Sequence, residues 1–407
     1  MRICFITSCY KLPGAPIGGL PIHYELLAHG LVERGNKVTV LYCDRFGSTN
    51  FKQIKGDLSF VPVHFPIPEI FRKRFIGGTI NKLGLSEHMR FRIDSKRIIS
   101  KFDQLHSQTF FDVVESPNNG ATFDAYQTQR HPPACIRIAT TDKSHCTTNA
   151  NAISPYHKCL FRAEAKCFHQ CPNLVTHTLS HRDLICKEYN LNPDRFTLIP
   201  LSVPIPDKSK LIKNRHSPSI KVLFVGRFEL RKGIDVLLQA IPKAIKKLPN
   251  LEFRLVGPDP QSSFQKSFAV KHAASILKKV IFLGEKIGEP LQEEYRNCDF
   301  FVAPSRYESF GLIFAEAMSF GKAVIGTTSG GIPEVVEDGT TGILCPPDSP
   351  ERLANAIFQL ASSASKREDM GRAGRKSVIN KFSLPNLIQE TESYYRMLIN
   401  TRQSEKP

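Results

Sequence analysis

Short apolar runs of strand length alternate with longer stretches of helical period along most of this chain. Leu20–Arg34, for example, places apolar residues at helical spacing between two such runs and stops at Gly35. The predicted strands of the first half are Arg2–Thr7, Lys37–Tyr42, Ser59–His64, Asp112–Val114, Ala134–Ile138, Leu174–Thr178 and Phe196–Ile199. Alternating strands and helices are typical of βαβ units and a parallel sheet. The pattern therefore predicts the α/β class.

The alternation restarts after a proline-flanked, polar and basic segment, residues 204–218, which is a predicted linker. The predicted strands beyond it are Lys221–Val225, Glu252–Val256, Val280–Leu283, Phe300–Ala303, Ala323–Ile325 and Gly342–Leu344. Two doubly wound domains follow, residues 1–203 and 219–382. A last predicted helix, residues 383–400, carries an apolar stripe with which it could cross back over the first domain.

The net charge of the chain indicates which kinds of partner it can bind. Its 55 lysines and arginines against 38 aspartates and glutamates give a net charge of +17, which favours polyanionic partners. The densest basic run extends from Arg72 to Lys101, and it is either an anion-binding surface or a solvated helical face. No apolar run approaches the ~18 residues of a membrane span. The 11 scattered cysteines show no disulfide spacing and indicate a reducing, cytoplasmic compartment.

Glycine-rich turns follow the first strand of each predicted domain. Gly18 and Gly19 precede the first helix, where bare backbone amides favour an anion, although a tight turn without a ligand explains them equally well. The second turn, Gly226–Gly233, also contains two cations, Arg227 and Lys232. They either bind a diphosphate or are solvated cations at the surface. The first turn lacks the G-x-G-x-x-G pattern of dinucleotide binding, and this disfavours a nicotinamide-dependent oxidoreductase.

Two carboxylates eight residues apart mark the segment Ala303–Met318. Glu308 lies in a polar loop after a predicted strand, and Glu316 lies inside the following apolar helix, where a carboxylate is costly unless it is paired or bonded to a ligand. A hydroxyl-rich ligand would satisfy it. The amides of Phe310, Gly311 and Leu312 would point at the same ligand from the start of the helix.

Together these motifs resemble the retaining glycosyltransferases of family four, which have the GT-B fold of two facing Rossmann-like domains with an interdomain cleft. The resemblance spans nearly the whole chain. It is carried by the Glu308 to Glu316 spacing, Gly226-Arg227 with Lys232-Gly233, Gly18-Gly19, and Gly330–Glu334 before Gly339–Leu344.

The resemblance implies that the chain transfers a hexose-type sugar, with retention, from a nucleotide-diphosphate sugar. The acceptor would be a glycan, a lipid-linked or phosphorylated compound, or a small molecule. The implied catalytic residues are Arg227 and Lys232 on the diphosphate and Glu308 on the transferred sugar. Glu316 would bind the ribose, and the other implied donor-binding residues are Gly18, Gly19, Gly226, Phe310, Gly311 and Leu312. No Asp-x-Asp pair occurs in the chain, so no metal cofactor is expected.

The acceptor side departs from the family pattern. Ala139 stands where the family often has a histidine, with His145 six residues on. Glu115 and Asn118 follow a predicted strand. They either contact the acceptor or belong to the structure of the loop. His23 either reaches the cleft or occupies a surface position of its helix. Cys167, His169 and Cys171 fit no common zinc spacing, and buried structural cysteines explain them better.

The alternative function is a basic nucleic-acid-binding protein, which the absence of any recognisable binding module disfavours, so no nucleic-acid partner is expected. The basic run from Arg72 to Lys101 predicts instead a phosphorylated or lipid-linked acceptor, or peripheral contact with an anionic membrane on its cytoplasmic face.

Overall fold

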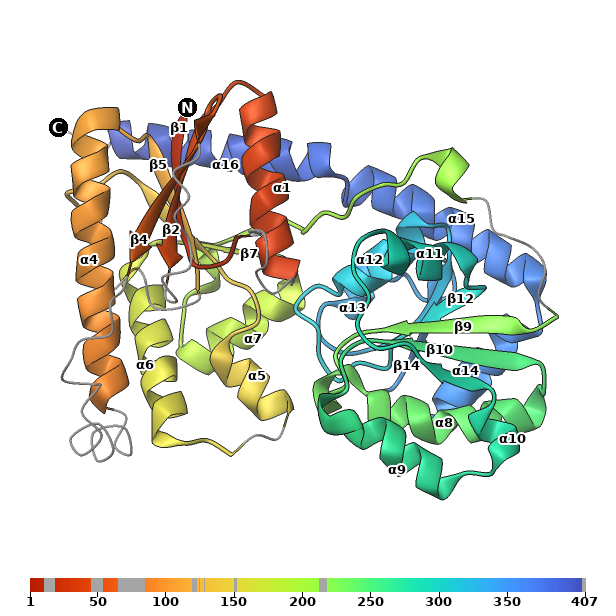
Figure 1. The fold of residues 1–407 in the computed structure, drawn as a ribbon. Coiled ribbons are helices and arrows are strands. Elements are labelled where there is room, and N and C mark those ends of the chain that lie inside the picture. Colours follow the sequence, from red (N-terminus) through yellow and green to blue (C-terminus); the bar gives the residue numbers. More distant parts are fainter. Residues whose placement is uncertain are drawn as a thin grey trace. The chain divides into compact units, whose positions relative to one another are not determined.

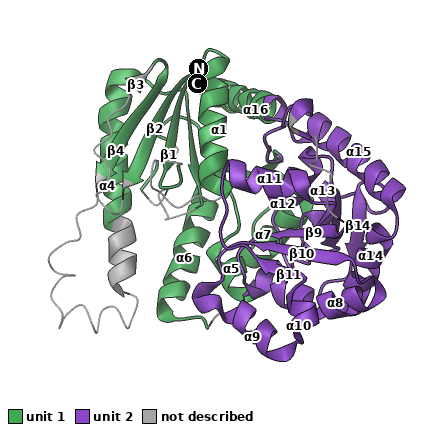
Figure 2. Cartoon of the chain, turned by 45° about the vertical axis from the view of Figure 1, so that its right-hand side comes forward, with its two compact units in different colours: residues 1–147, 151–199, 387–407 green, residues 148–150, 200–386 purple. Residues whose placement is uncertain are grey.

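The computed structural model describes residues 1–10, 19–44, 54–64, 85–118, 123, 125–127, 129–149, 152–211 and 218–404. The chain divides into two compact units (Figure 1, Figure 2). The first contains residues 1–147, 151–199 and 387–407, and the second contains residues 148–150 and 200–386. Each unit holds one sheet of its own, so the α/β class predicted from the alternating pattern is confirmed.

The first unit is built on an eight-stranded sheet in the order β3-β4-β2-β1-β5-β6-β7-β8. Its strands are β1 (Arg2–Thr7), β2 (Lys37–Asp44), β3 (Ile54–Lys55), β4 (Leu58–His64), β5 (Val113–Pro117), β6 (Ala134–Arg137), β7 (Asn173–Thr176) and β8 (Phe196–Leu198). All neighbours pair in parallel except β3 and β4, which are antiparallel. The central strand β1 buries every residue but Arg2, as expected of a covered parallel strand.

The helices of the first unit are α1 (Gly19–Glu33), α4 (Leu85–Thr109), α5 (Asp142–Thr148), α6 (Pro155–Gln170), α7 (Leu179–Tyr189) and most of α16 (Leu384–Ser404). Helices α4 and α6 pack against each other (Figure 1). Helix α1 lies close to α16, because a Cβ on Gly30 would come within 2.6 Å of the Ile388 side chain. Glycine at this position therefore permits the close approach of the two helices.

The second unit is built on a six-stranded parallel sheet in the order β11-β10-β9-β12-β13-β14. Its strands are β9 (Ile220–Val225), β10 (Leu251–Val256), β11 (Val280–Phe282), β12 (Phe300–Val302), β13 (Ala323–Thr327) and β14 (Gly342–Cys345). Its helices are α8 (Ile234–Lys247), α9 (Ser263–Lys271), α10 (Ala274–Leu277), α11 (Glu289–Asn297), α12 (Leu312–Ser319), α13 (Ile332–Val335), α14 (Pro350–Ala361) and α15 (Ala364–Lys381).

The boundaries of the units differ from the predicted ones. Leu201 and Val203 belong to the hydrophobic core of the second unit, and the amide of Val203 donates to the carbonyl of Phe382 at 3.1 Å. The chain therefore enters the second unit at residue 200, before the predicted linker. At the other end the division falls inside α16, and the helix belongs to the first unit from Leu387 onward.

Candidate functional site

Two loops of the second unit bring its candidate residues together. One follows β9 and ends in the 3₁₀ turn Leu230–Lys232, which Gly233 closes at φ +67°. The other follows β12 and leads to α12, which starts after Gly311 at φ +99°. Strands β9 and β12 are neighbours in the sheet, and a Cβ on Gly233 would come within 1.9 Å of the Pro304 carbonyl oxygen. Only glycine allows the loops to approach so closely at this backbone angle.

Lys232 and Glu308 form a buried ion pair between these loops. The Nζ atom of Lys232 lies 2.6 Å from Oε1 of Glu308, and the same oxygen accepts a hydrogen bond from the Ser305 hydroxyl at 3.0 Å. Nη1 of Arg231 lies 3.3 Å from the second oxygen of Glu308. Burial raises the pKa of Glu308, but Lys232 and Arg231 outweigh it and hold that pKa below its usual value. Glu308 is therefore a charged carboxylate.

Arg231 links Glu308 to a second carboxylate. Its Nη2 and Nε atoms lie 2.8 and 3.1 Å from Oε1 of Glu229, and its Nη1 also donates to the carbonyl of Tyr307 at 3.1 Å. Arg227 meets the same Oε1 of Glu229 at 3.3 Å, with 56% of its side chain exposed. Arg227 and Lys232 are thus paired with different carboxylates, and Arg231 lies between the two pairs.

Glu316 is bonded within the protein, as its place in an apolar helix requires. The hydroxyl of Tyr295, on α11, donates to Oε2 of Glu316 at 2.8 Å. Burial raises the pKa of Glu316, while the Tyr295 hydrogen bond and the charge of Lys232 oppose that rise. A carboxylate in this setting is suited to accept further hydrogen bonds from hydroxyl groups.

The start of α12 is fixed by packing. Phe310 is buried, with its ring centroid 5.1 Å from that of Phe382. Gly311 precedes the helix, and a Cβ there would come within 2.9 Å of the Phe314 ring. Leu312 is the first helical residue and is half-buried. The first amides of a helix lack partners in their own ladder, so this terminus favours an anion or a hydroxyl oxygen.

The loop that follows β13 contacts the backbone of Glu308. The amide of Gly331 donates to the Glu308 carbonyl at 2.8 Å. A Cβ on Gly330, at φ +57°, would come within 2.4 Å of that carbonyl oxygen. Gly226 directly follows β9, and its amide donates to the Val256 carbonyl at 2.9 Å. Glycines at these turns thus place the backbone of Glu308 and of the β9 loop.

Sequence reasoning missed three residues of this site: Arg231, Ser305 and Tyr295. Arg231 stands in the motif that drew attention to Arg227 and Lys232, but its burial and its contacts with two carboxylates cannot be read from the motif. The Ser305 hydroxyl lies three residues before Glu308, a spacing that could have been noticed. Tyr295 lies on another helix, and no local pattern connects it with Glu316.

The first unit places two of the predicted acceptor residues in its interior. Glu115 lies inside β5, not after it, and is fully buried. Its carboxylate meets Nε and Nη2 of Arg137 at 2.7 and 3.0 Å and accepts from the Tyr395 hydroxyl at 2.8 Å. The predicted position of Glu115 after a strand is therefore wrong, and so is its interpretation as loop structure. A run of polar residues is typical of a loop, and this is why the strand was predicted to end before Glu115. A carboxylate can nevertheless lie inside a buried strand where a buried cation neutralises its charge.

Asn118 is likewise buried, and its amide groups hold neighbouring segments. Its Nδ2 donates to Oε1 of Glu164 at 2.9 Å, and its Oδ1 accepts from the amide of Ala139 at 2.9 Å. His23 is also buried, so the prediction of a surface position is wrong. Burial lowers the pKa of His23 well below its usual value, with help from Arg137 and His177, and the ring is neutral.

The remaining predicted positions are partly covered. Gly18 lies outside the described residues, and Gly19 is the exposed first residue of α1. Of the basic run, Lys96 and Arg97 are exposed on α4, whereas Arg72, Lys73 and Arg74 lie outside the described residues. The described part of the chain contains no group of three His, Cys, Asp or Glu side chains that could hold a metal ion. Nor does any described helix have the length and apolar character to cross a membrane.

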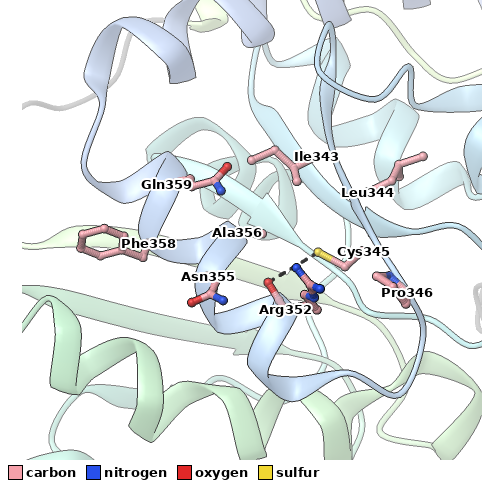
Figure 3. A pocket seen from close by; sticks show the side chains of 9 residues that line it. All are labelled: Ile343, Leu344, Cys345, Pro346, Arg352, Asn355, Ala356, Phe358 and Gln359. Atoms are coloured by element: carbon pink, nitrogen blue, oxygen red, sulfur yellow. Dashed lines mark hydrogen bonds between the residues drawn. The ribbon is translucent and has the colours of Figure 1, made fainter.

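A hollow of about 560 Å³ lies apart from these residues, between β14 and α14 (Figure 3). Leu344, Cys345, Arg352 and Phe358 are among the residues that line it. The Cys345 thiol donates to the Arg352 carbonyl at 3.8 Å across one side. None of the predicted site residues lines this hollow.

Comparison with known proteins relates this geometry to a family. Residues 207–377, most of the second unit, match the model of the family described as glycosyl transferases group 1. A curated protein of Methanocaldococcus jannaschii, described as an uncharacterized glycosyltransferase, is 25% identical over 412 residues, 98% of either chain. The second unit is thus similar to the group 1 glycosyl transferases. The D-inositol 3-phosphate glycosyltransferase of Paenarthrobacter aurescens is similar to this chain as well, with 27% identity over 90% of either chain.

Solved structures show the fold of this chain. Sucrose-phosphate synthase from Thermosynechococcus elongatus superposes with a TM-score of 0.76 at 19% identity, covering 98% of this chain and 100% of the other. Anabaena HepE in complex with UDP gives a TM-score of 0.70 at 16% identity over 98% and 100% of the two chains. These likenesses confirm the GT-B fold that the sequence motifs implied.

Proposed function

We propose that this chain is a retaining hexosyltransferase whose donor is a nucleotide-diphosphate sugar. The observation that supports the proposal best is the buried Lys232–Glu308 pair with Glu316 on the next helix. Cations for a diphosphate and carboxylates for hydroxyl groups are thereby gathered at the ends of two neighbouring strands. Open α/β sheets bind their ligands at this edge.

Retention requires the acceptor to attack from the face that the diphosphate leaves. Positive charge then builds at the anomeric carbon and negative charge on the leaving phosphate, so stabilisation of the leaving group is the main catalytic contribution. Lys232 and Arg227 supply two cations, and the first amides of α12 supply a partial positive charge. Because more than half of the Arg227 side chain is exposed, it can turn toward an incoming diphosphate.

The two carboxylates take different hydroxyl groups in this proposal. Glu308, which the structure holds as a charged group, accepts from hydroxyls of the transferred sugar. Glu316, oriented by Tyr295, accepts from the ribose. Anabaena HepE has been solved with UDP and with UDP-glucose, which supports a nucleotide sugar as donor here and makes uridine the first base to test.

We propose further that transfer needs no divalent metal, since Arg227 and Lys232 occupy the role of a bridging cation. The acceptor, a glycan or a lipid-linked or phosphorylated compound, would bind through the first unit, with Gly19 at the start of α1 close to it. Glu115 and Asn118 support that unit from inside and are not proposed as acceptor contacts.

Contact with an anionic membrane remains part of the proposal, and α4 and α6 supply the surface for it. Five basic residues described on these two helices are exposed: Lys96, Arg97, Lys158, Arg162 and Lys166. The partly exposed carboxylate of Asp103, also on α4, lies 2.9 Å from His131. The three of α6 recur at four-residue spacing and form one stripe. Each basic residue near an anionic surface contributes about 1 kcal/mol.

Flotation with anionic vesicles tests this surface. Changing Lys158, Arg162 and Lys166 together to Ala should abolish salt-sensitive flotation, whereas the same change at the exposed Lys266, Lys271 and Lys278 of the second unit should not. Equal flotation of the wild type and the α6 variant would show that the stripe is only a solvated face.

Variants at four positions test the donor roles. Arg227→Ala and Lys232→Ala should mainly lower kcat, by roughly 10²–10³, because each removes a preorganised partner of developing charge. Glu316→Ala should weaken free-nucleotide binding, since the ribose is remote from the bond that breaks, and Glu308→Ala should spare nucleotide binding but impair transfer. Calorimetric nucleotide affinities beside initial rates make the comparison. Unchanged nucleotide affinity in Glu316→Ala, or full turnover in Arg227→Ala, would contradict these roles.

A further inference from the structure

We propose that Arg231 is a positioning residue: it remains the counter-ion of Glu229 and Glu308 when Arg227 and Lys232 leave these carboxylates for the donor diphosphate. This inference rests on the proposed function and adds a residue to it. The motif implies roles for Arg227 and Lys232, but it implies none for Arg231.

The geometry separates Arg231 from its two neighbours. Arg231 bonds both carboxylates at once, with Nη2 2.8 Å from Glu229 and Nη1 3.3 Å from Glu308. Among the described carboxylates, Arg227 bonds Glu229 alone and Lys232 bonds Glu308 alone. The guanidinium fork makes this double contact possible, and a lysine ammonium could not reproduce it.

Burial and backbone contacts hold Arg231 in place. Only 6% of its side chain is exposed, against 56% for Arg227. Its Nη1 donates to the carbonyl of Tyr307, and its own carbonyl accepts from the amide of Arg306 at 2.8 Å. Arg231 is therefore tied to the loop that carries Glu308, and it is not free to follow a ligand.

The balance of charge shows what this arrangement achieves. Three cations face two carboxylates in the absence of donor. A diphosphate that draws Arg227 and Lys232 toward itself breaks the contacts at 3.3 and 2.6 Å. Without Arg231 the buried Glu308 would then be charged and unpaired, which is strongly unfavourable. With Arg231 in place both carboxylates keep a partner, so the two cations exchange partners at little cost.

Proton uptake distinguishes this role from a merely structural one. In Arg231→Ala, Glu308 loses its last cation when Lys232 moves to the diphosphate, and a buried, unpaired carboxylate takes up a proton. Binding of a nucleotide sugar should therefore become coupled to proton uptake, and it should tighten as the pH falls from about 8 to about 6. The loss of affinity near pH 8 should be about 10- to 100-fold, the range for losing a charged partner.

Titration calorimetry of the full chain, in two buffers of different ionisation enthalpy, measures the uptake. UDP-glucose is the first probe, because its diphosphate does not titrate in this range. The wild type should take up almost no proton, and Arg231→Ala should take up as much as one. The double variant Arg231→Ala/Glu308→Gln should lose that uptake. KM should rise more than kcat falls, because the defect lies in binding the donor.

Arg367→Ala is the matched control. Arg367 is an arginine of the same unit whose guanidinium caps carbonyls of α14, Leu360 at 2.6 Å and Ala361 at 2.8 Å. Its loss should lower stability without changing affinity or proton uptake. If Arg231→Ala does not fold, Arg231→Lys serves, since one ammonium cannot bond both carboxylates and a smaller uptake is still expected.

The outcomes separate the two proposals. A wild type that binds none of the UDP and GDP sugars would count against the proposed function itself. A wild type that binds, with Arg231 variants of equal affinity and no proton uptake, would overturn the role of Arg231 alone.

Discussion

Single residues of this protein differ in how far their roles follow from the sequence. Lys232 and Glu308 stand in recognisable motifs, and the structure joins them at 2.6 Å. Arg231 stands beside Lys232, yet burial alone distinguishes it from a solvated cation. That burial depends on a loop about eighty residues away in the sequence, and no local pattern reports it.

Glu164 provides a prediction at this scale. Burial raises its pKa to about 8, with a contribution from Asp142, although Asn118 and Tyr189 donate hydrogen bonds to it. The folded chain thus holds a proton that the unfolded chain releases above the ordinary carboxyl pKa. The stability from this group is fully present below that ordinary pKa and is lost as pH rises toward 8.

Glu164→Gln removes the titration. The melting temperature of this variant should therefore fall less than that of the wild type between about pH 5 and pH 8. If the melting temperatures of both proteins change equally over this pH range, Glu164 does not titrate there and its raised pKa is contradicted.

Elements were predicted more completely than single roles. Every predicted strand coincides with an observed one, because parallel strands leave continuous apolar runs in the sequence. Strand β5 is longer than predicted, since Glu115 and Ser116 carry no apolar signal. The two-residue strand β3 was missed because it is too short to show a period.

The turn that ends at Gly233 yields a prediction for an element. Gly233→Ala would add a Cβ within 1.9 Å of the Pro304 oxygen, at φ +67°. Gly339→Ala is its control, because φ is +75° there but nothing lies within 4 Å of a Cβ. Both should pay the left-handed backbone cost of about 1–2 kcal/mol, and only Gly233→Ala should also displace the β9 loop.

Melting temperatures and donor affinities of the two variants make this comparison. Gly233→Ala should melt lower than Gly339→Ala and bind the donor more weakly, whereas Gly339→Ala should keep wild-type affinity. Equal melting temperatures and equal affinities would mean that the loops after β9 and β12 do not depend on this close approach.

Apart from residues 148–150, the chain passes between the two units twice, and the sequence marks only the first passage, which lies close to the predicted linker. The repeated alternation of strands and helices predicted two sheets, and the glycosyltransferase family and GT-B fold bear out the resemblance. The unit boundary nevertheless falls inside the continuous helix α16, whose Tyr395 bonds the buried Glu115 of β5. The helical period of the sequence predicts that one face of α16 is apolar and buried, but it does not indicate against which of the two hydrophobic cores that face packs.

The most direct test of the whole account is transfer from UDP and GDP sugars, followed by release of free nucleotide and by the anomeric configuration of the product. We expect release from one nucleotide sugar, equal rates in EDTA and in magnesium, and a product with the anomeric configuration of the donor. An inverted product, or an enzyme that EDTA silences and magnesium restores, would contradict it.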